Sequence, residues 1–205
     1  MNRAGKSFLI PVRELLPSEI TRIRREAVDK VVAMASIELK KPVTDLVVRD
    51  IRPYSDLAWC SGSTATNALT TDQWTATLVA SACYQAYVSL IATASKTMAD
   101  SRWVAITGIK DFRQNEATKV KGIINFFKIE VGGNDRVIWD LQGMETYPYG
   151  MAAISPSVVV IPQNTAFDLY IYHAESSDGN AASNVKMYLV LDGFVVEPRG
   201  KVISP

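Results

Sequence analysis

The sequence predicts a mainly β chain of the α+β class, in which N-terminal helices precede an antiparallel β-sandwich. The strongest observation is a strict alternation of side chains between residues 157 and 196. One strand face carries Phe167, Leu169, Ile171 and His173, and the pattern returns with Val185, Met187, Leu189 and Leu191. A period of two is typical of antiparallel strands with one buried face. The second observation is an apolar stripe at helical spacing between residues 18 and 40.

The sandwich is expected to occupy the chain from residue 103 onward. The predicted strands are Trp103–Ile109, Lys121–Val131, Arg136–Gln142, Ser157–Ile161, Phe167–His173, Val185–Leu191, Phe194–Glu197 and Lys201–Ile203. We expect six of their residues to face the interior: Phe127, Ile129, Leu169, Ile171, Leu189 and Leu191. Gly132-Gly133-Asn134-Asp135 predicts a hairpin turn, because glycine and asparagine tolerate positive φ. Pro162-Gln163-Asn164 predicts another turn, and Asp192-Gly193 a turn or a bulge.

Residues 18–40 are predicted to form the first helix. Ser18 is the expected N-cap, with Glu19 in the first turn. The apolar stripe consists of Ile20, Ile23, Ala27, Val31 and Met34. Pro42 favours an end to the helix just before it, because the residue preceding a proline avoids helical geometry.

The charged face of this helix contains Arg22, Arg24 and Arg25, which supports two interpretations. The three arginines are a candidate contact for phosphate groups. The alternative is a solvated face with intrahelical ion pairs, and the sequence favours it because acidic residues are interspersed and dilute the positive field.

Residues 43–51 are predicted to form a strand and residues 52–70 a loop. Residues 71–97 are predicted to form a second, long helix, because apolar side chains cover one broad helical face and hydroxyl side chains the other. A pair of strands is the main alternative, since Thr, Val and Tyr are common here. A membrane-spanning helix fits poorly, because Gln73, Gln85 and many hydroxyl groups interrupt the segment.

Composition narrows the class of protein. The net charge of +1 argues against a dominant role in nucleic-acid binding. Cys60 and Cys83 are too few for a disulfide scaffold or a cysteine-only zinc site, and whether they pair stays open. The N-terminal apolar run is too short for a signal peptide, so we expect synthesis in a cytoplasm without export. We expect residues 1–100 to form an arm, the helices and one strand, and residues 101–205 the sandwich, in one compact unit.

No catalytic or cofactor motif stands out, so we expect no enzyme activity, no cofactor and no metal. His173 is the single histidine, and a structural role at a strand end is the favoured interpretation. The turn-rich loop with Tyr147 and Tyr149, near Trp139, is a candidate sugar platform or subunit contact, and the contact is favoured.

The C-terminal hundred residues resemble a single jelly-roll of the kind that builds icosahedral virus capsids. The resemblance rests on about eight short strands, long polar corner loops and the closing run V-L-D-G-F-V-V-E-P-R-G-K-V-I. It implies a structural protein of the virion that assembles with copies of itself and with other virion proteins, with weak or indirect contact to nucleic acid. A carbohydrate-binding or adhesion module is the alternative, since jelly-rolls also occur in lectins.

The arm at residues 1–16 is the first candidate for a subunit contact. Its apolar residues are Phe8, Leu9, Ile10, Leu15 and Leu16, while Pro11 and Pro17 interrupt regular structure. Two interpretations stay open. The arm either crosses the core of its own chain or docks on another subunit.

Overall fold

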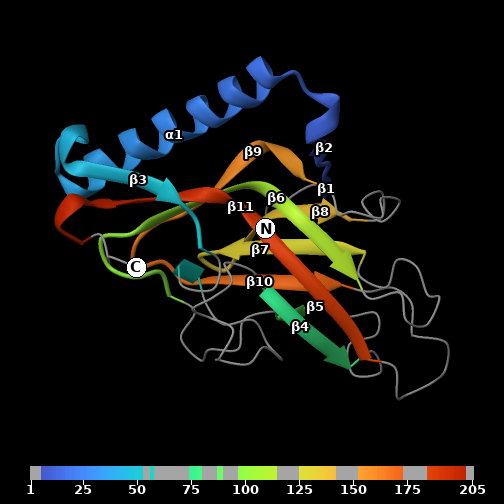
Figure 1. The fold of residues 1–205 in the computed structure, drawn as a ribbon. Helices are drawn as coiled ribbons and strands as arrows, with labels where there is room; N and C mark the ends of the chain where they lie inside the picture. Colours follow the sequence, from blue (N-terminus) through green and yellow to red (C-terminus); the bar gives the residue numbers. More distant parts are fainter. Residues whose placement is uncertain are drawn as a thin grey trace.

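The protein is a β-sandwich of two facing sheets with one long helix packed on the outside (Figure 1). The structure, a computed structural model, describes residues 6–52, 56–57, 74–79, 87–89, 97–114, 125–141, 152–172 and 184–201. The two facing sheets confirm the predicted mainly β class. The layers are helix, sheet B and sheet A, and a hydrophobic core fills each of the two spaces between them.

Sheet A has five strands among the described residues. In spatial order they are β1 (Lys6–Ser7), β8 (Asn134–Asp140), β7 (Phe126–Val131), β10 (Phe167–Tyr172) and β5 (Tyr87–Ser89). The pair β1·β8 is parallel, and the other pairs of this sheet are antiparallel. Gly132 and Gly133 join β7 to β8 with φ angles of 62° and 74°, so the predicted hairpin turn is confirmed.

Sheet B has six strands among the described residues, all paired in antiparallel fashion. Their order is β2 (Ile10–Pro11), β9 (Ala153–Ile161), β6 (Trp103–Gln114), β11 (Asn184–Pro198) and β3 (Leu46–Asp50), with β4 (Trp74–Val79) also paired to β11. The strand β11 therefore has β6 along one edge, and β4 and β3 in succession along the other.

The strands pair as a nested hairpin. Among strands β3 to β11, the outermost pair joins β3 to β11, the next β5 to β10, then β6 to β9, and the innermost β7 to β8. In this part of the chain β4 is the exception, because it shares β11 with β3, and the arm strands β1 and β2 lie outside the nested order, since they pair with β8 and β9. Successive pairs of strands lie alternately in sheet B and sheet A. The paired strands therefore enclose one hydrophobic core between the two sheets.

The core between the sheets contains all six residues that the alternation assigned to it. Phe127, Ile129, Leu169, Ile171, Leu189 and Leu191 are at most 1% exposed. Phe127 stacks on Trp139, with ring centroids 5.7 Å apart. Trp139 is fully buried, so the interpretation of this residue as part of a surface sugar platform is wrong.

The second core lies between sheet B and helix α1 (Pro17–Leu39). Ala27, Val31 and Ala35 recur at every fourth residue, and these small side chains let the helix approach the sheet closely. They pack with residues such as Trp103 and Phe194. The expected inward position of Met34 is wrong, because its side chain lies at the margin of this stripe and is 38% exposed.

The start of α1 also differs from the prediction. The N-cap is Leu16 and not Ser18, because Pro17 occupies the first helical position, where a missing N–H is not needed. Glu19 accepts a hydrogen bond of 2.8 Å from the Leu16 amide. At the other end, Lys40 adopts a left-handed conformation before Pro42, which ends the helix as expected.

The predicted helix over residues 71–97 is wrong, and the alternative of two strands is correct for the part that the structure describes. Strand β4 pairs with β11, and β5 pairs with β10. Their Trp, Thr, Tyr and Val side chains suit a sheet.

Several predicted strand boundaries are corrected. Strand β6 continues to Gln114 and does not end at Ile109, and β9 begins at Ala153 and not at Ser157. The segments expected as Val185–Leu191 and Phe194–Glu197 form the single strand β11, with register shifts between Val190 and Leu191 and between Asp192 and Gly193. The expected strand 43–51 starts with a 3-10 turn, η2 (Val43–Asp45), before β3. Lys201 belongs to the 3-10 turn η7 (Arg199–Lys201), and residues 202–205 lie outside the described part. Among the described helices, none has the length and apolarity needed to cross a membrane.

We predict that Ile171→Ala lowers the free energy of unfolding by about 2–5 kcal/mol, the usual cost of a large-to-small change in a packed core. Ile171 is 1% exposed and lies between the sheets. Urea unfolding of the purified protein measures this. The matched control is Ile37→Ala, because Ile37 is 79% exposed and its truncation should change stability by less than about 0.5 kcal/mol. Equal effects of the two substitutions would contradict the assignment of the core.

Candidate functional site

The described residues contain no group of three or more His, Cys, Asp and Glu side chains placed to hold a metal ion. His173, Cys60, Cys83, Tyr147 and Tyr149 lie outside the described residues. The expectations of no catalytic site, no cofactor and no metal therefore stay predictions.

The arm is partly a strap across its own sandwich. Its short strand β1 pairs with β8 of sheet A, and β2 pairs with β9 of sheet B, so the arm crosses from one sheet to the other. Leu9 packs against the core between the sheets, and Ile10 is half-buried opposite Ile154. The Val12 amide donates a hydrogen bond of 2.9 Å to the Ala152 carbonyl oxygen. These contacts support the interpretation of the arm as a strap.

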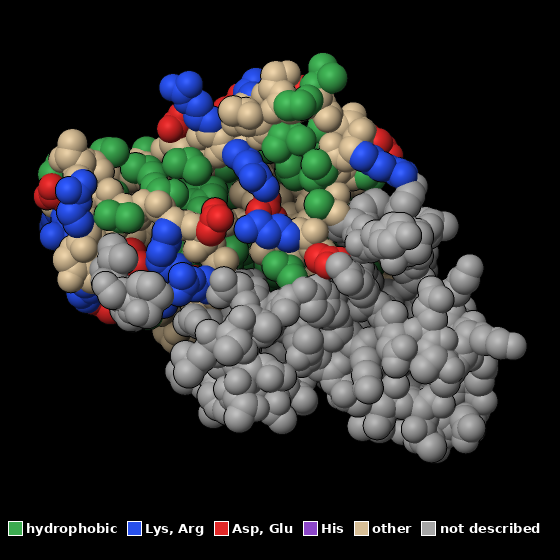
Figure 2. All heavy atoms as spheres, in the orientation of Figure 1, with side chains coloured by type: hydrophobic (Ala, Val, Ile, Leu, Met, Phe, Trp, Pro, Cys, Tyr) green, Lys and Arg blue, Asp and Glu red, His purple; other side chains and the backbone are tan. Residues whose placement is uncertain are grey.

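Two arm residues face outward. Phe8 is 68% exposed and Leu16 is 65% exposed, whereas Leu15 is half-buried. The sequence grouped all five apolar residues of the arm, and the structure divides them into inner and outer sets. Further along the chain, Ile37 and Val43 are also exposed, at 79% and 56%. Figure 2 shows hydrophobic side chains gathered along α1 and near its start, with charged side chains between them.

The arginines of α1 all lie near carboxylates. Arg22 contacts Glu26 at 2.9 Å, and Arg25 lies 3.8 Å from Asp29. Both are ion pairs within the helix, as in the interpretation of this face that the sequence favoured. Arg24 instead reaches sheet B, where it donates to the Asp192 carboxylate at 2.9 Å.

Asp192 is a buried carboxylate beneath α1, with 6% of its surface exposed. The hydroxyl of Thr107 donates to it at 3.1 Å, and the ammonium group of Lys110 lies 3.9 Å away. Thr107 and Lys110 are the two residues of β6 that the register shifts leave without a partner on β11. The bulges in β6 thus place both donors beside one carboxylate.

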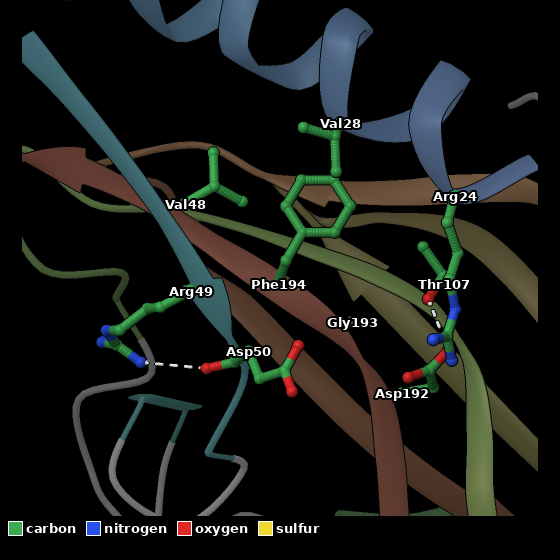
Figure 3. A pocket seen from close by; sticks show the side chains of 9 residues that line it. All are labelled: Arg24, Val28, Val48, Arg49, Asp50, Thr107, Asp192, Gly193 and Phe194. Atoms are coloured by element: carbon green, nitrogen blue, oxygen red, sulfur yellow. Dashed lines mark hydrogen bonds and ion pairs between the residues drawn. The ribbon is translucent and has the colours of Figure 1, made fainter. Parts of the chain in front are cut away.

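A pocket of about 200 Å³ opens beside this carboxylate, between α1, β3 and β11. Its lining residues are Arg24, Val28, Val48, Arg49, Asp50, Thr107, Asp192, Gly193 and Phe194. In Figure 3, Val28, Val48 and Phe194 form an apolar side, and Arg24, Thr107 and Asp192 form a polar side. A Cβ atom at position 193 would clash with the Ala105 carbonyl oxygen, so only glycine lets β11 pass β6 this closely at the pocket floor.

Arg49 extends away from the pocket in Figure 3 and belongs to a second polar cluster. Its guanidinium donates to Asp56 at 2.7 and 2.6 Å and to Glu197 at 2.9 Å. Arg102 also donates to Glu197, at 3.2 Å. Asp56 and Glu197 are 5% and 2% exposed. Hydrogen bonds from Arg49 to Asp56, then to Glu197, raise the pKa of Arg49 although burial opposes them, so the arginine stays charged.

Sequence reasoning missed both polar clusters, because their members are far apart in the chain. Arg24 and Asp192 are separated by 168 residues, and Arg49 and Glu197 by 148. The one local signal was a charged residue inside a predicted strand, Arg49 in V-V-R-D-I.

The outer face of sheet A carries an aromatic cluster. The Lys128 ammonium lies 4.4 Å from the ring centroid of Tyr170 and 4.9 Å from that of Tyr87. It also contacts Asp135 at 2.9 Å. Burial, and then a hydrogen bond to Asp168, raise the pKa of Tyr170 to about 12, so its hydroxyl group stays protonated at neutral pH. The Lys128 ammonium thus lies over one face of each of these two rings.

Comparisons of the chain with protein-family models, with curated proteins and with solved structures return no match.

We predict that Glu197→Gln lowers the free energy of unfolding by about 3 kcal/mol, because it leaves two nearly buried arginines short of one negative charge. Removal of one partner from a fully buried ion pair can cost more than this. We expect the smaller loss of stability because 24% of the Arg49 side chain is exposed to water. Thermal or urea unfolding measures this. The control Glu26→Gln removes an exposed partner of Arg22 and should cost less than about 0.5 kcal/mol. A negligible effect of Glu197→Gln would mean that the cluster contributes nothing to stability.

Proposed function

We propose that this chain is a structural protein that assembles with copies of itself, as a component of a viral capsid. The observation that carries the proposal is the nested order of the strands. Numbering the strands from β3 to β11 without β4 gives eight, and they pair first with eighth, second with seventh, third with sixth and fourth with fifth. This order is the one expected of a jelly-roll, the architecture shared by many capsid and lectin domains.

The surface adds a second argument. Phe8, Leu16, Ile37 and Val43 are each more than half exposed. Large apolar side chains at the surface are ordinary when they are scattered singly, but a protein that closes a shell must cover such groups with neighbouring subunits. Their positions on the arm, along α1 and just after it make this side of the molecule the proposed subunit contact.

The proposal includes a location and partners. The chain would reside in the virion, in contact with copies of itself and with other virion proteins. Contact with nucleic acid would be weak or indirect, because Arg22, Arg24 and Arg25 each lie close to a carboxylate. Phosphate binding would have to displace these carboxylates or share the arginines with them.

Binding of carbohydrate is the second candidate, and the aromatic cluster of sheet A is the observation that favours it. Tyr87 is 39% exposed there and lies beside Tyr172, with ring centroids 5.1 Å apart. Sugars bind to open aromatic faces with neighbouring carboxylates. The position of Lys128 over the rings makes this candidate the weaker one.

We predict that the purified protein forms large closed particles, seen by size-exclusion chromatography and negative-stain electron microscopy. Deletion of residues 1–16 should leave a folded sandwich, because α1 and strands β3 to β11 supply the buried residues of both cores, but should shift the protein to small species. Circular dichroism tests whether the deletion variant is folded.

A full-length protein that stays a monomer at high concentration would contradict self-assembly. In that case, retardation on immobilised glycans, lost in Tyr87→Ala, would favour the carbohydrate-binding alternative. Particles of full size from the deletion variant would show that the arm is dispensable for assembly.

A further inference from the structure

The pocket beneath α1 matches an aromatic side chain in size. Its volume is about 200 Å³, and Val28, Val48 and Phe194 form one side of it. An apolar cavity of about 150 Å³ is large enough to hold a benzene molecule. A phenyl ring entering from outside would contact the three apolar side chains and leave Asp192 in its existing hydrogen bonds.

The same molecule presents an aromatic side chain with no cover. Phe8 is 68% exposed, and it lies between β1 and β2, the two short strands of the arm. Its neighbours hold it in place, because β2 pairs with β9 and Leu9 packs on the core. Phe8 is therefore an exposed ring on a segment whose neighbours are held against the sandwich.

The ring and the pocket lie at opposite edges of sheet B. The strand order of this sheet begins with β2, beside Phe8, and ends with β3, which lines the pocket (Figure 1). Four strand spacings separate these edges, roughly 20 Å. Because the arm is tied to β9, Phe8 of one chain cannot fill the pocket of the same chain.

We infer that Phe8 of one copy inserts into the pocket of the next copy, in a head-to-tail contact. The inference rests on the proposed self-assembly and names the surface that carries it. Such a heterologous contact leaves a free ring at one end and a free pocket at the other, so it propagates until the assembly closes. A symmetric two-fold contact would instead stop at a dimer.

Charge supports the same pairing. The arm, residues 1–16, contains three basic residues, Arg3, Lys6 and Arg13, and one acidic residue, Glu14, which lies 3.9 Å from Arg13. On the pocket rim, Asp50 has 88% of its side chain exposed, and its contact with Lys110 is loose at 3.8 Å. The positive excess of the arm suits contact with this exposed carboxylate.

The Phe8 ring would supply only part of the area that a stable interface buries. A buried aromatic side chain contributes about 150–250 Å², whereas a stable interface buries about 800 Å² on each partner. The flanking surface of α1 and the arm, with Leu16 exposed at 65%, is available for the remainder. Anchors of this type carry a large share of binding energy, and loss of one commonly weakens a contact by about thirtyfold or more.

The experiment compares two single variants with matched controls. Phe8→Ser removes the ring, and Val48→Phe fills the pocket from within. Phe8 is 68% exposed and Val48 is 39% exposed, so we expect both variants to fold. Thermal unfolding of each variant checks this. Each variant should raise the concentration needed for assembly by about thirtyfold or more. The control Phe8→Met keeps a large and adaptable apolar side chain. The control Val48→Thr keeps the shape of the side chain, and its hydroxyl group can reach water because Val48 is 39% exposed. Both controls should assemble within about threefold of the unaltered protein, as expected of changes at exposed positions.

Mixing the two variants tests the direction of the contact. Phe8→Ser protein keeps a pocket without a ring, and Val48→Phe protein keeps a ring without a pocket. Sedimentation of the mixture should show one-to-one dimers, while each variant alone stays monomeric. If Val48→Phe does not fold, Val48→Met provides a smaller filling side chain.

The outcomes separate the two proposals. If the unaltered protein assembles and Phe8→Ser assembles equally well, the inference is overturned while self-assembly stands. If Phe8→Ser fails but the pocket-filling variants assemble normally, the ring binds elsewhere and the inference is also overturned. If the unaltered protein never assembles, the proposed function fails first and the inference fails with it.

Discussion

The burial of β11 on both faces is the constraint on which the rest of the structure depends. Leu189, Leu191 and Val195 point into the core between the sheets, while Phe194 and Val196 point into the core under α1. A strand buried on two sides needs partners along both edges to satisfy its backbone. β6 supplies one edge, and β3 with β4 supplies the other. Strand β11 therefore contributes to both hydrophobic cores and connects helix α1, sheet B and the core between the sheets.

The polar residues around β11 follow from the same constraint. The strand carries two buried carboxylates, Asp192 and Glu197, and each is surrounded by cations or donors from elements distant in sequence. A shift in the pairing of β11 with its neighbours would separate both carboxylates from their partners. Each buried charge left unpaired in this way would cost several kcal/mol. The two carboxylates thus select the register in which β3, β6 and α1 meet β11. The bulges at Thr107 and Lys110 are the backbone adjustment that this register requires.

Local patterns in the sequence predicted much of the fold, and long-range pairing accounts for the errors. Alternation is a property of neighbouring residues, so the six interior positions, such as Leu169, were assigned correctly. Residues 71–97 carry few signals that separate a helix from strands, and the partners that decide the matter, β10 and β11, come about a hundred residues later. Phe8 was identified as an apolar residue of an arm that either crosses its own chain or docks on another subunit. The pocket was not identified, because its lining combines α1, β3, β6 and β11.

The distant origin of the pocket residues bears on how the chain is made. Val28 and Val48 are synthesised well before Gly193 and Phe194, so the pocket can form only after β11 has left the ribosome. The pairing of β3 with β11 has the same long separation, which places sheet closure late in folding. A nascent chain that has not yet reached β11 carries Phe8 but no pocket, so two such chains could not bind each other through the proposed contact. Under that proposal, the order of synthesis would delay association until β11 has been made.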